Sequence, residues 1–248
     1  MDIEGNWEKI RIHRERFDGR EARGLALVLF RDNEEWLAAK LRQRKDEALA
    51  VEFLGYLGMD GSGGAVKVLL DTLETGDEAL QAAVTEVLKK CPHELTIEAL
   101  ISMMVRHKQV AVKAGEVILS YGDAGADALW KLWFDDKSPA SLKARILELL
   151  TEVSDPRIER LAFLAFLDDD DELTDAALKA AERIDGRALW GNVAACLAKP
   201  SWKLRGRAVR LLGKWNESRA LPYLLDMDAD PDPWVEEERR KAIADIGL

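Results

Sequence analysis

Two cysteines and three histidines are the residues of this chain best suited to nucleophilic or metal chemistry. One group lies close together in sequence and offers metal-binding side chains, namely Cys91, His93, Glu94 and His107. The intervals between these residues match no established ligand pattern. Cys91 also stands at a repeated position that is otherwise apolar, occupied by Leu57, Val153, Ile184, Trp215 and Ile246. We therefore expect a buried structural thiol and predict no metal site.

A run of acids at 168–172, Asp-Asp-Asp-Asp-Glu, is the other candidate for cation binding. It lacks the spaced ligands and the glycine of an EF-hand loop. Acids at a helix start favour the helix dipole, so we expect a solvated turn that caps the next helix. The GxxxxGK[ST], GxSxG and HExxH patterns are absent, as is a GxGxxG after a strand. The sequence predicts no catalytic residue, no metal and no cofactor.

The elements that carry these residues repeat along the chain. Similar helix-ending segments place an apolar residue at a constant interval of 31, at Leu88, Leu119, Leu150, Ala181, Leu212 and Ile243. A further copy has Leu54, and its three extra residues fall in the loop at 61–64. Equal steps of this kind indicate a tandem array in which each copy is one structural unit. We expect this column of residues to be buried.

Each repeat is predicted to hold two helices. In one copy, apolar residues at helical spacing run from 126 to 134, a break follows at 135–139, and a second stripe runs from 141 to 152. A helix pair this short cannot bury its apolar face alone, so the pairs must stack. The predicted fold is all-α, an α-solenoid of about six to seven stacked helix pairs with residues 33–248 as one domain.

Residues 1–32 are less regular than the repeats that follow. We expect two N-terminal capping helices, at 7–17 and 20–31. A short strand is the alternative, because Ile10 and Ile12 alternate with charged residues.

The repeats resemble HEAT-like repeats, in particular the short bacterial class named after the phycobilisome-lyase subunits. The resemblance covers residues 33–248 and rests on segments such as Asp-Pro-Trp-Val at 232–235 and Leu-Gly-Lys-Trp-Asn at 212–216. It implies a right-handed solenoid whose second helices line a concave binding face, and the role of a scaffold. Because phycobilin lyases use this repeat, the resemblance also keeps a subunit of a lyase-type enzyme as an alternative.

Two other HEAT-type families are less similar. Deoxyhypusine hydroxylases bind two iron ions through several His-Glu pairs, and here only His93-Glu94 is present. AlkD-type DNA glycosylases use a Trp-Trp-Asp segment, whereas the nearest segment here is Trp-Lys-Leu-Trp-Phe-Asp at 130–135. Trp133 is therefore expected to pack in the core or at its flank.

Basic residues gather between Gly186 and Asn216, a repeat with seven Lys and Arg and no acid. The core stripe of its second helix is predicted to be Leu204, Ala208, Leu211 and Trp215. One position earlier, about 100° round the helix, the same spacing gives a basic stripe of Lys203, Arg207, Arg210 and Lys214. We predict that this basic stripe faces a partner.

Pairing between repeats is the alternative use of these charges. The next repeat places Glu238 in register with Arg207, and Asp245 in register with Lys214. Ion pairs on a solvated face contribute only ~0–1 kcal/mol each, but they would neutralise the stripe.

Aromatic residues extend the predicted binding surface. Trp202 and Trp234 stand at the starts of predicted helices. Two interpretations suit these positions, namely exposed anchors of an interface and buried packing between neighbouring repeats. In an earlier repeat the stripe position is apolar or aromatic, with Val110, Ala114, Val117 and Tyr121, and would form an adhesive patch if exposed. The predicted partner-binding residues are the basic stripe, Trp202, Trp234 and Tyr121.

Composition limits the function classes. The chain has 248 residues, and its 36 Lys and Arg against 46 Asp and Glu give a net charge of −10, which disfavours a general nucleic-acid binder. No apolar run is long enough to cross a membrane. Two cysteines and an acidic N-terminus without a signal-like segment predict a cytoplasmic protein.

The predicted function is a non-enzymatic scaffold that binds an acidic or extended segment of a partner protein. The alternatives are a lyase-type enzyme subunit and nucleic-acid binding through the basic repeat.

Overall fold

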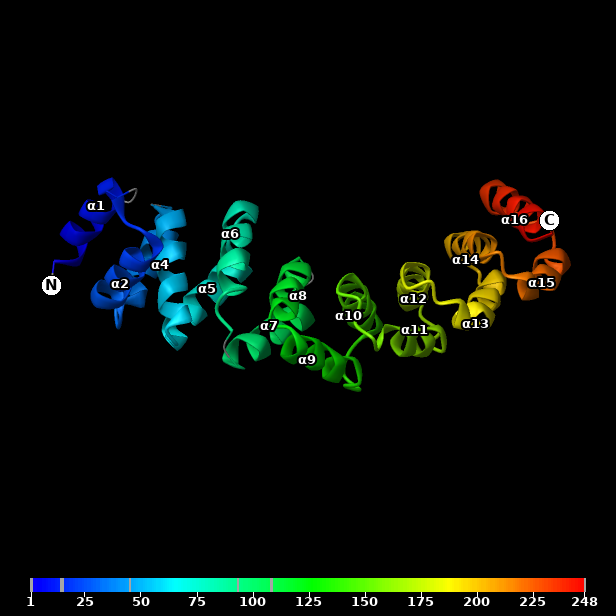
Figure 1. Ribbon diagram of the computed structural model, residues 1–248, viewed down its shortest axis with the longest axis horizontal. Coiled ribbons are helices and arrows are strands. Elements are labelled where there is room, and N and C mark those ends of the chain that lie inside the picture. The colour runs from blue at the N-terminus through cyan, green and yellow to red at the C-terminus, as the bar shows by residue number, and fades with distance from the viewer. Residues whose placement is uncertain (1, 14–15, 45, 93, 108, 248) are drawn as a thin grey trace. The chain divides into compact units, whose positions relative to one another are not determined.

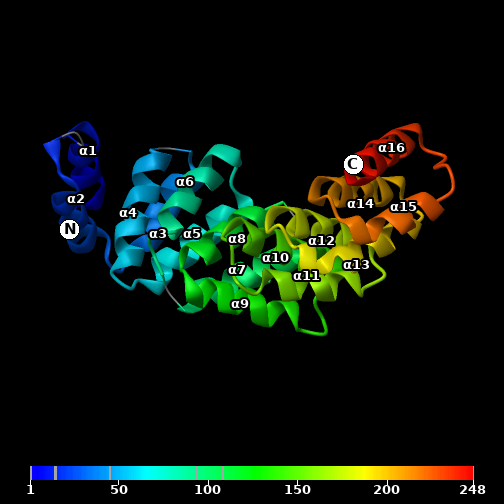
Figure 2. The ribbon, with the colours of Figure 1, turned by 45° about the vertical axis from the view of Figure 1, so that its right-hand side comes forward.

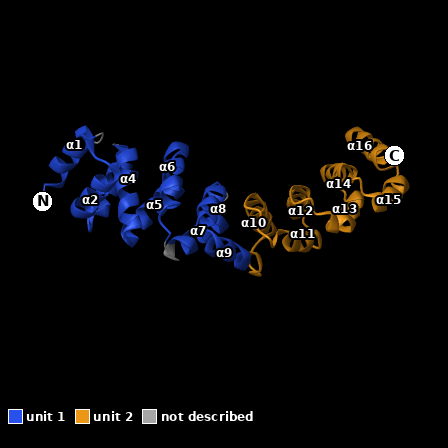
Figure 3. Ribbon diagram, in the orientation of Figure 1, with its two compact units in different colours: residues 1–132 blue, residues 133–248 orange. Residues whose placement is uncertain are grey.

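The computed structural model describes residues 2–13, 16–44, 46–92, 94–107 and 109–247. These residues form α-helices, 3-10 turns and connecting loops, with no β-strand among them. The chain divides into two compact units, unit 1 at 1–132 and unit 2 at 133–248 (Figure 3). Within the described residues, no helix is both long enough and apolar enough to span a membrane.

Unit 1 consists of consecutive helices joined by short loops (Figure 1). Its helices are α1 (Ile3–His13), α2 (Gly19–Phe30), α3 (Glu34–Arg42), α4 (Glu47–Met59), α5 (Gly63–Thr75), α6 (Glu78–Leu88), α7 (Glu94–Arg106), α8 (Ala111–Ser120) and α9 (Asp123–Trp133), the last of which ends one residue into unit 2. Helix α4 packs against α6, and α6 against α8. The described N-terminal residues form two helices as expected, but the first lies at Ile3–His13 and not at 7–17, whereas the second, Gly19–Phe30, is close to the expected 20–31. The alternative strand is wrong, because Ile10 and Ile12 both lie in α1.

Unit 2 has two layers of helices (Figures 1 and 2). The second helices of successive repeats, which form one layer, are α10 (Ala140–Glu152), α12 (Asp171–Arg183), α14 (Trp202–Trp215) and α16 (Pro233–Gly247). The other layer holds the first helices α11 (Ile158–Phe166), α13 (Trp190–Ala195) and α15 (Leu221–Asp226), with 3-10 turns at 187–189, 196–198 and 218–220. Helix α10 packs on α12, α12 on α14, and α14 on α16.

Side-chain caps fix where several helices begin. Asp18 accepts hydrogen bonds from the backbone N–H groups of residues 20 and 21, and Glu21 closes the capping box. Ser62, Asp77 and Asp170 each accept a bond from the N–H three residues later, which begins α5, α6 and α12. Polar residues between the apolar stripes therefore set the helix boundaries.

The 31-residue column lies near the end of each second helix. Five of its members are buried with no more than 1% of their surface exposed, namely Leu54, Leu88, Leu150, Ala181 and Leu212. Leu119 and Ile243 are only partly buried. The prediction that the column is buried is confirmed for five positions, whereas Leu119 and Ile243 are less buried than predicted.

This difference predicts unequal effects of the same substitution. Leu150→Asp places a carboxylate where no surface is exposed, so the free energy of unfolding should fall by several kcal/mol, on the order of half or more of the total. At Leu119 the new carboxylate keeps contact with water, so the loss should be clearly smaller. Urea titrations followed by circular dichroism measure both, and equal losses would show that the structure misplaces this column.

Candidate functional site

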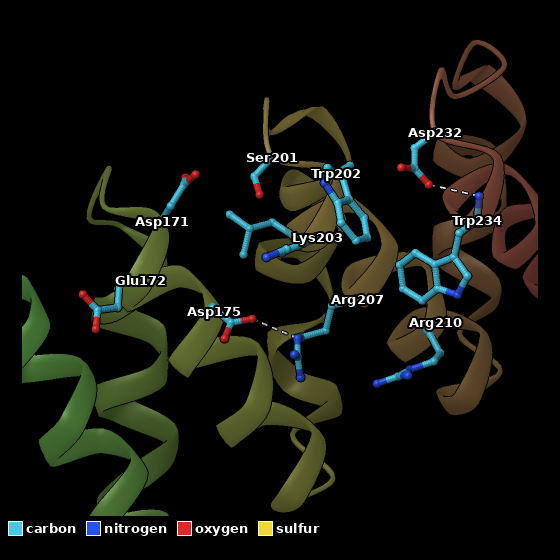
Figure 4. Close-up of a pocket in the computed structure, with 11 residues that line it drawn as sticks. Asp171, Glu172, Asp175, Ser201, Trp202, Lys203, Arg207, Arg210, Asp232 and Trp234 are labelled. Atoms are coloured by element: carbon cyan, nitrogen blue, oxygen red, sulfur yellow. Dashed lines mark hydrogen bonds and ion pairs between the residues drawn. The ribbon is translucent and has the colours of Figure 1, made fainter.

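The N-terminal halves of α12, α14 and α16 enclose a groove of about 680 Å³ in unit 2 (Figure 4). Acids, cations and two indoles line it, contributed by Asp171, Glu172, Asp175, Ser201, Trp202, Lys203, Leu204, Arg207, Arg210, Asp232 and Trp234. Five residues predicted to bind a partner therefore lie around one groove, namely Trp202, Lys203, Arg207, Arg210 and Trp234. Lys214 lies further along α14, outside the lining.

The loops before the three helices hold the groove in place. Asp170 caps α12, and the Asp232 carboxylate accepts from the N–H groups of Trp234 and Val235, at 3.0 and 3.2 Å, to start α16. Arg205 joins two of these loops. Its guanidinium donates twice to Asp230, at 2.6 and 2.9 Å, and to the carbonyl oxygens of residues 199 and 200. The start of α14 is thereby tied to the loop that leads into α16.

A second arginine secures the other side of that loop. Arg239 donates to Glu236 through two nitrogens and to the carbonyl oxygens of Leu224 and Met227 at the end of α15. The hydrogen bonds from Arg239, and then from the N–H of Asp230, lower the pKa of Glu236 from 4.5 to about 2. Glu236 is therefore ionised at neutral pH and holds the first turn of α16 against the loop that precedes it.

The two stripes of α14 have the predicted burial. Leu204, Ala208, Leu211 and Trp215 expose 2% of their surface or less. Lys203, Arg210 and Lys214 are exposed, and Arg207 is half-buried. The core stripe packs inside unit 2 and the basic stripe lines or flanks the groove.

Two members of the basic stripe form ion pairs with α12. The Nε of Arg207 lies 2.9 Å from Oδ1 of Asp175 (Figure 4). The Nζ of Lys214 lies 3.2 Å from Oε1 of Glu182. The expectation of pairing between repeats is correct, but the predicted partners, Glu238 and Asp245 of α16, are wrong. Glu238 instead contacts Lys241 within its own helix.

The rotation of α14 about its axis explains why Arg207 and Lys214 pair with α12 and not with α16. Gly206 and Gly213 face α16, because a β-carbon on either would collide with Trp234 or Ala242. Arg207 and Lys214 each follow one of these glycines by one residue, so they point about 100° away from α16. They reach the acids of the preceding helix instead.

Arg210 and Lys203 are the unpaired cations of this repeat. Residues 133–247 are all described, and within them the other basic residues between Gly186 and Asn216 contact a carboxylate, namely Arg187, Lys199, Arg205, Arg207 and Lys214. Lys203 and Arg210 make no ion pair with this part of the chain, although the Nζ of Lys203 lies 5.7 Å from the Trp202 ring centre. The positive charge available to a ligand is therefore that of two side chains in the groove.

The two indoles pack on one another and keep a free surface. Their ring centres are 5.9 Å apart with the planes at 81°, an edge-to-face arrangement. Trp202 is 44% exposed and Trp234 is 40% exposed. Each ring therefore packs on the ring of the neighbouring repeat and also keeps part of its surface in solvent. Trp234 lies directly on the backbone of α14, because a β-carbon at Gly206 would be 1.9 Å from its Cζ3.

Tyr121 does not join this group. It lies at the end of α8 in unit 1, where its hydroxyl donates to the carbonyl oxygen of Leu88 at 2.7 Å. Burial raises its pKa above the ordinary value of 10. The other residues of that stripe position, Val110, Ala114 and Val117, expose 2% of their surface or less, so the expected patch is not exposed.

The described residues that the sequence offered for metal binding make structural contacts instead. Cys91 is 1% exposed, its thiol contacts the carbonyl oxygens of Val87 and Gly55, and burial raises its pKa to about 11. His107 contacts Glu74 at 2.7 Å, and His93 lies outside the described residues. The acid run caps α12 as expected and pairs with Lys199 through Asp169. No group of three or more His, Cys, Asp or Glu suited to a metal ion occurs in the described residues.

Comparison with known proteins gives little further information. No protein-family model matches the chain, and no curated protein matches it. Among solved structures, the chain is similar to a crystal structure of an engineered protein from a structural genomics consortium, with 16% identity over 87% of this chain and 96% of that one. The TM-score of 0.31 is too low to carry an argument about fold or function.

The ion pair between α12 and α14 predicts a specific rescue. Arg207→Glu places like charges together at Asp175 and should lower the free energy of unfolding by ~1 kcal/mol or less. Adding Asp175→Arg should recover part of this loss, because it restores an ion pair with residue 207 but gives up the one with Lys179, whereas adding Glu238→Arg should recover none. Urea titrations of the single and double variants measure the coupling. Rescue by Glu238→Arg alone would support the register with α16.

The close contact between Gly206 and the Trp234 ring leads to a second prediction. Gly206→Ala should displace the Trp234 ring and lose the stabilisation of ~1 kcal/mol that alanine normally gives inside a helix. Gly191→Ala is the matched control, because its β-carbon would meet nothing within 4 Å. The indole N–H signals in ¹H–¹⁵N spectra, assigned with Trp202→Phe and Trp234→Phe, report the displacement. Unchanged signals in Gly206→Ala would contradict the packing described here.

Proposed function

We propose that this chain is a HEAT-like α-solenoid that acts as a non-enzymatic binding module and holds an extended segment of a partner protein in the groove of unit 2. The helix pairs at 31-residue spacing, with second helices packed on one another within each unit, support the repeat type. The observation that carries the binding role is the pair of partly exposed indoles beside two unpaired cations.

Several properties of the groove favour a polypeptide as the ligand. Tryptophan and arginine contribute most often to the binding energy of protein interfaces. The groove volume of about 680 Å³ falls in the range of pockets that bind small molecules, so it has room for part of a peptide segment. Asp171, Glu172 and Asp232 line the same groove, and these carboxylates would repel the phosphates of a nucleic acid.

A random-peptide display library selected against the full-length protein tests this proposal. Peptides enriched on the wild type should bind Trp234→Ala and Arg210→Glu at least about tenfold more weakly, since both variants remove groove contacts. Lys137→Glu is the charge-matched control, because Lys137 is exposed in the loop before α10 and does not line the groove. It should bind the peptides as the wild type does.

Circular dichroism verifies that each variant keeps its helices. Peptides that bind the groove variants normally would refute the proposal, as would a selection without enrichment. A single-stranded oligonucleotide that binds the wild type more tightly than any peptide, and fails on Arg210→Glu, would favour the nucleic-acid alternative.

A further inference from the structure

The charges that remain free in the groove are separated by helix. On α12, Asp171 and Glu172 are exposed and form no ion pair with the described residues of unit 2, whereas Asp175 is shared between Lys179 and Arg207. On α14, Lys203 and Arg210 are the unpaired cations. Asp232, in the loop before α16, accepts hydrogen bonds from two backbone N–H groups at the start of that helix. The groove therefore has an acidic edge and a basic centre.

The aromatic surface lies beyond the basic centre. Trp202 and Trp234 meet where α14 and α16 pack, on the side of α14 away from α12 (Figure 4). Arg210 and Lys203 lie about 40° and 60° round the helix from Gly206, on which Trp234 lies, and therefore between the indoles and Arg207, which points to α12. Crossing the three helices in order, a ligand would meet free carboxylates, then free cations, then an apolar ring pair.

Resting on the proposed function, we infer that the groove selects a peptide segment with mixed charge. A basic side chain of the ligand lies by Asp171 and Glu172, an acidic one by Lys203 and Arg210, and an apolar one on the two indoles. Packed helices lie about 8–10 Å apart, and an extended chain advances about 3.3 Å per residue. The basic and acidic residues of the ligand are therefore separated by about three positions.

This order excludes ligands that a basic stripe alone would favour. A uniformly acidic segment satisfies Arg210 but places a carboxylate against Asp171 and Glu172. A uniformly basic segment meets those acids but opposes the cations of α14. A segment with a basic, then an acidic, then an apolar side chain complements all three regions. Arg207 and Asp175 neutralise each other, so this pair requires no charged group of the ligand.

Fluorescence anisotropy with capped synthetic peptides tests the inference on the full-length protein. The first probe is an extended peptide with an arginine, then a glutamate about three residues later, then a leucine. A probe of the opposite chain direction is included, because the groove does not fix which end of the ligand lies on α12. The comparison probes replace the arginine by glutamate, or the glutamate by arginine.

On the wild type, the mixed-charge probe should bind at least about fivefold more tightly than either uniformly charged probe. The double variant Asp171→Lys with Glu172→Lys should reverse this preference and bind the acidic probe best. Glu159→Lys with Asp168→Lys makes the same charge change at exposed acids outside the groove, and should keep the wild-type preference.

The outcomes separate this inference from the proposed function. Tightest binding of the acidic probe by the wild type, lost in Trp234→Ala, would overturn the charge order and leave the peptide-binding role standing. The same holds if the double variant keeps the wild-type preference. Failure of every probe, in both chain directions, to bind the wild type would overturn the inference, and the library selection then decides separately whether the groove binds peptides.

Discussion

The packing of α14 between α12 and α16 is the constraint on which the groove depends. The stripe of Leu204, Ala208 and Leu211 is buried, and this fixes the rotation of the helix about its axis. Gly206 and Gly213 then face α16, where they allow the close approach of Trp234 and Ala242. Once that rotation is set, Arg207 and Lys214 point to the acids of α12 and not to those of α16.

The ion pairs between second helices follow from the same geometry. Glu148 of α10 contacts Lys179 of α12, and Asp175 and Glu182 of α12 contact Arg207 and Lys214 of α14. In these three pairs of unit 2 the acid belongs to the earlier helix and the cation to the later one. Such pairs contribute little stability individually. The last two pairs have a larger effect, because they neutralise two of the four members of the basic stripe and leave Arg210 and Lys203 as its remaining positive charge.

The sequence predicted the helices well, because a 31-residue repeat supplies the same information many times. It located the core stripe of α14 and brought Arg207, Arg210 and Trp234 to one surface. It did not predict the partners of Arg207 and Lys214, because a shift of one residue turns a side chain by about 100° and the register alone does not fix that rotation. The acids Asp171, Glu172 and Asp175 were missed as groove residues, since a run of acids before a helix is equally typical of a solvated cap. The signal that could have found Asp175 is its spacing of 32 from Arg207.

The local order of charge matters more for this groove than the net charge of −10. At physiological ionic strength the screening length is about 8 Å, close to the spacing of two packed helices. Charges on α12 and α14 are therefore felt separately by a ligand that lies across both, and distant acids of the chain contribute little. A protein that is acidic as a whole can in this way present a basic centre, provided that the neighbouring acids are either paired, as Asp175 is, or one helix away, as Asp171 and Glu172 are. The buried pair of Arg205 with Asp230 keeps this order intact, because it ties the start of α14 to the loop that positions Trp234.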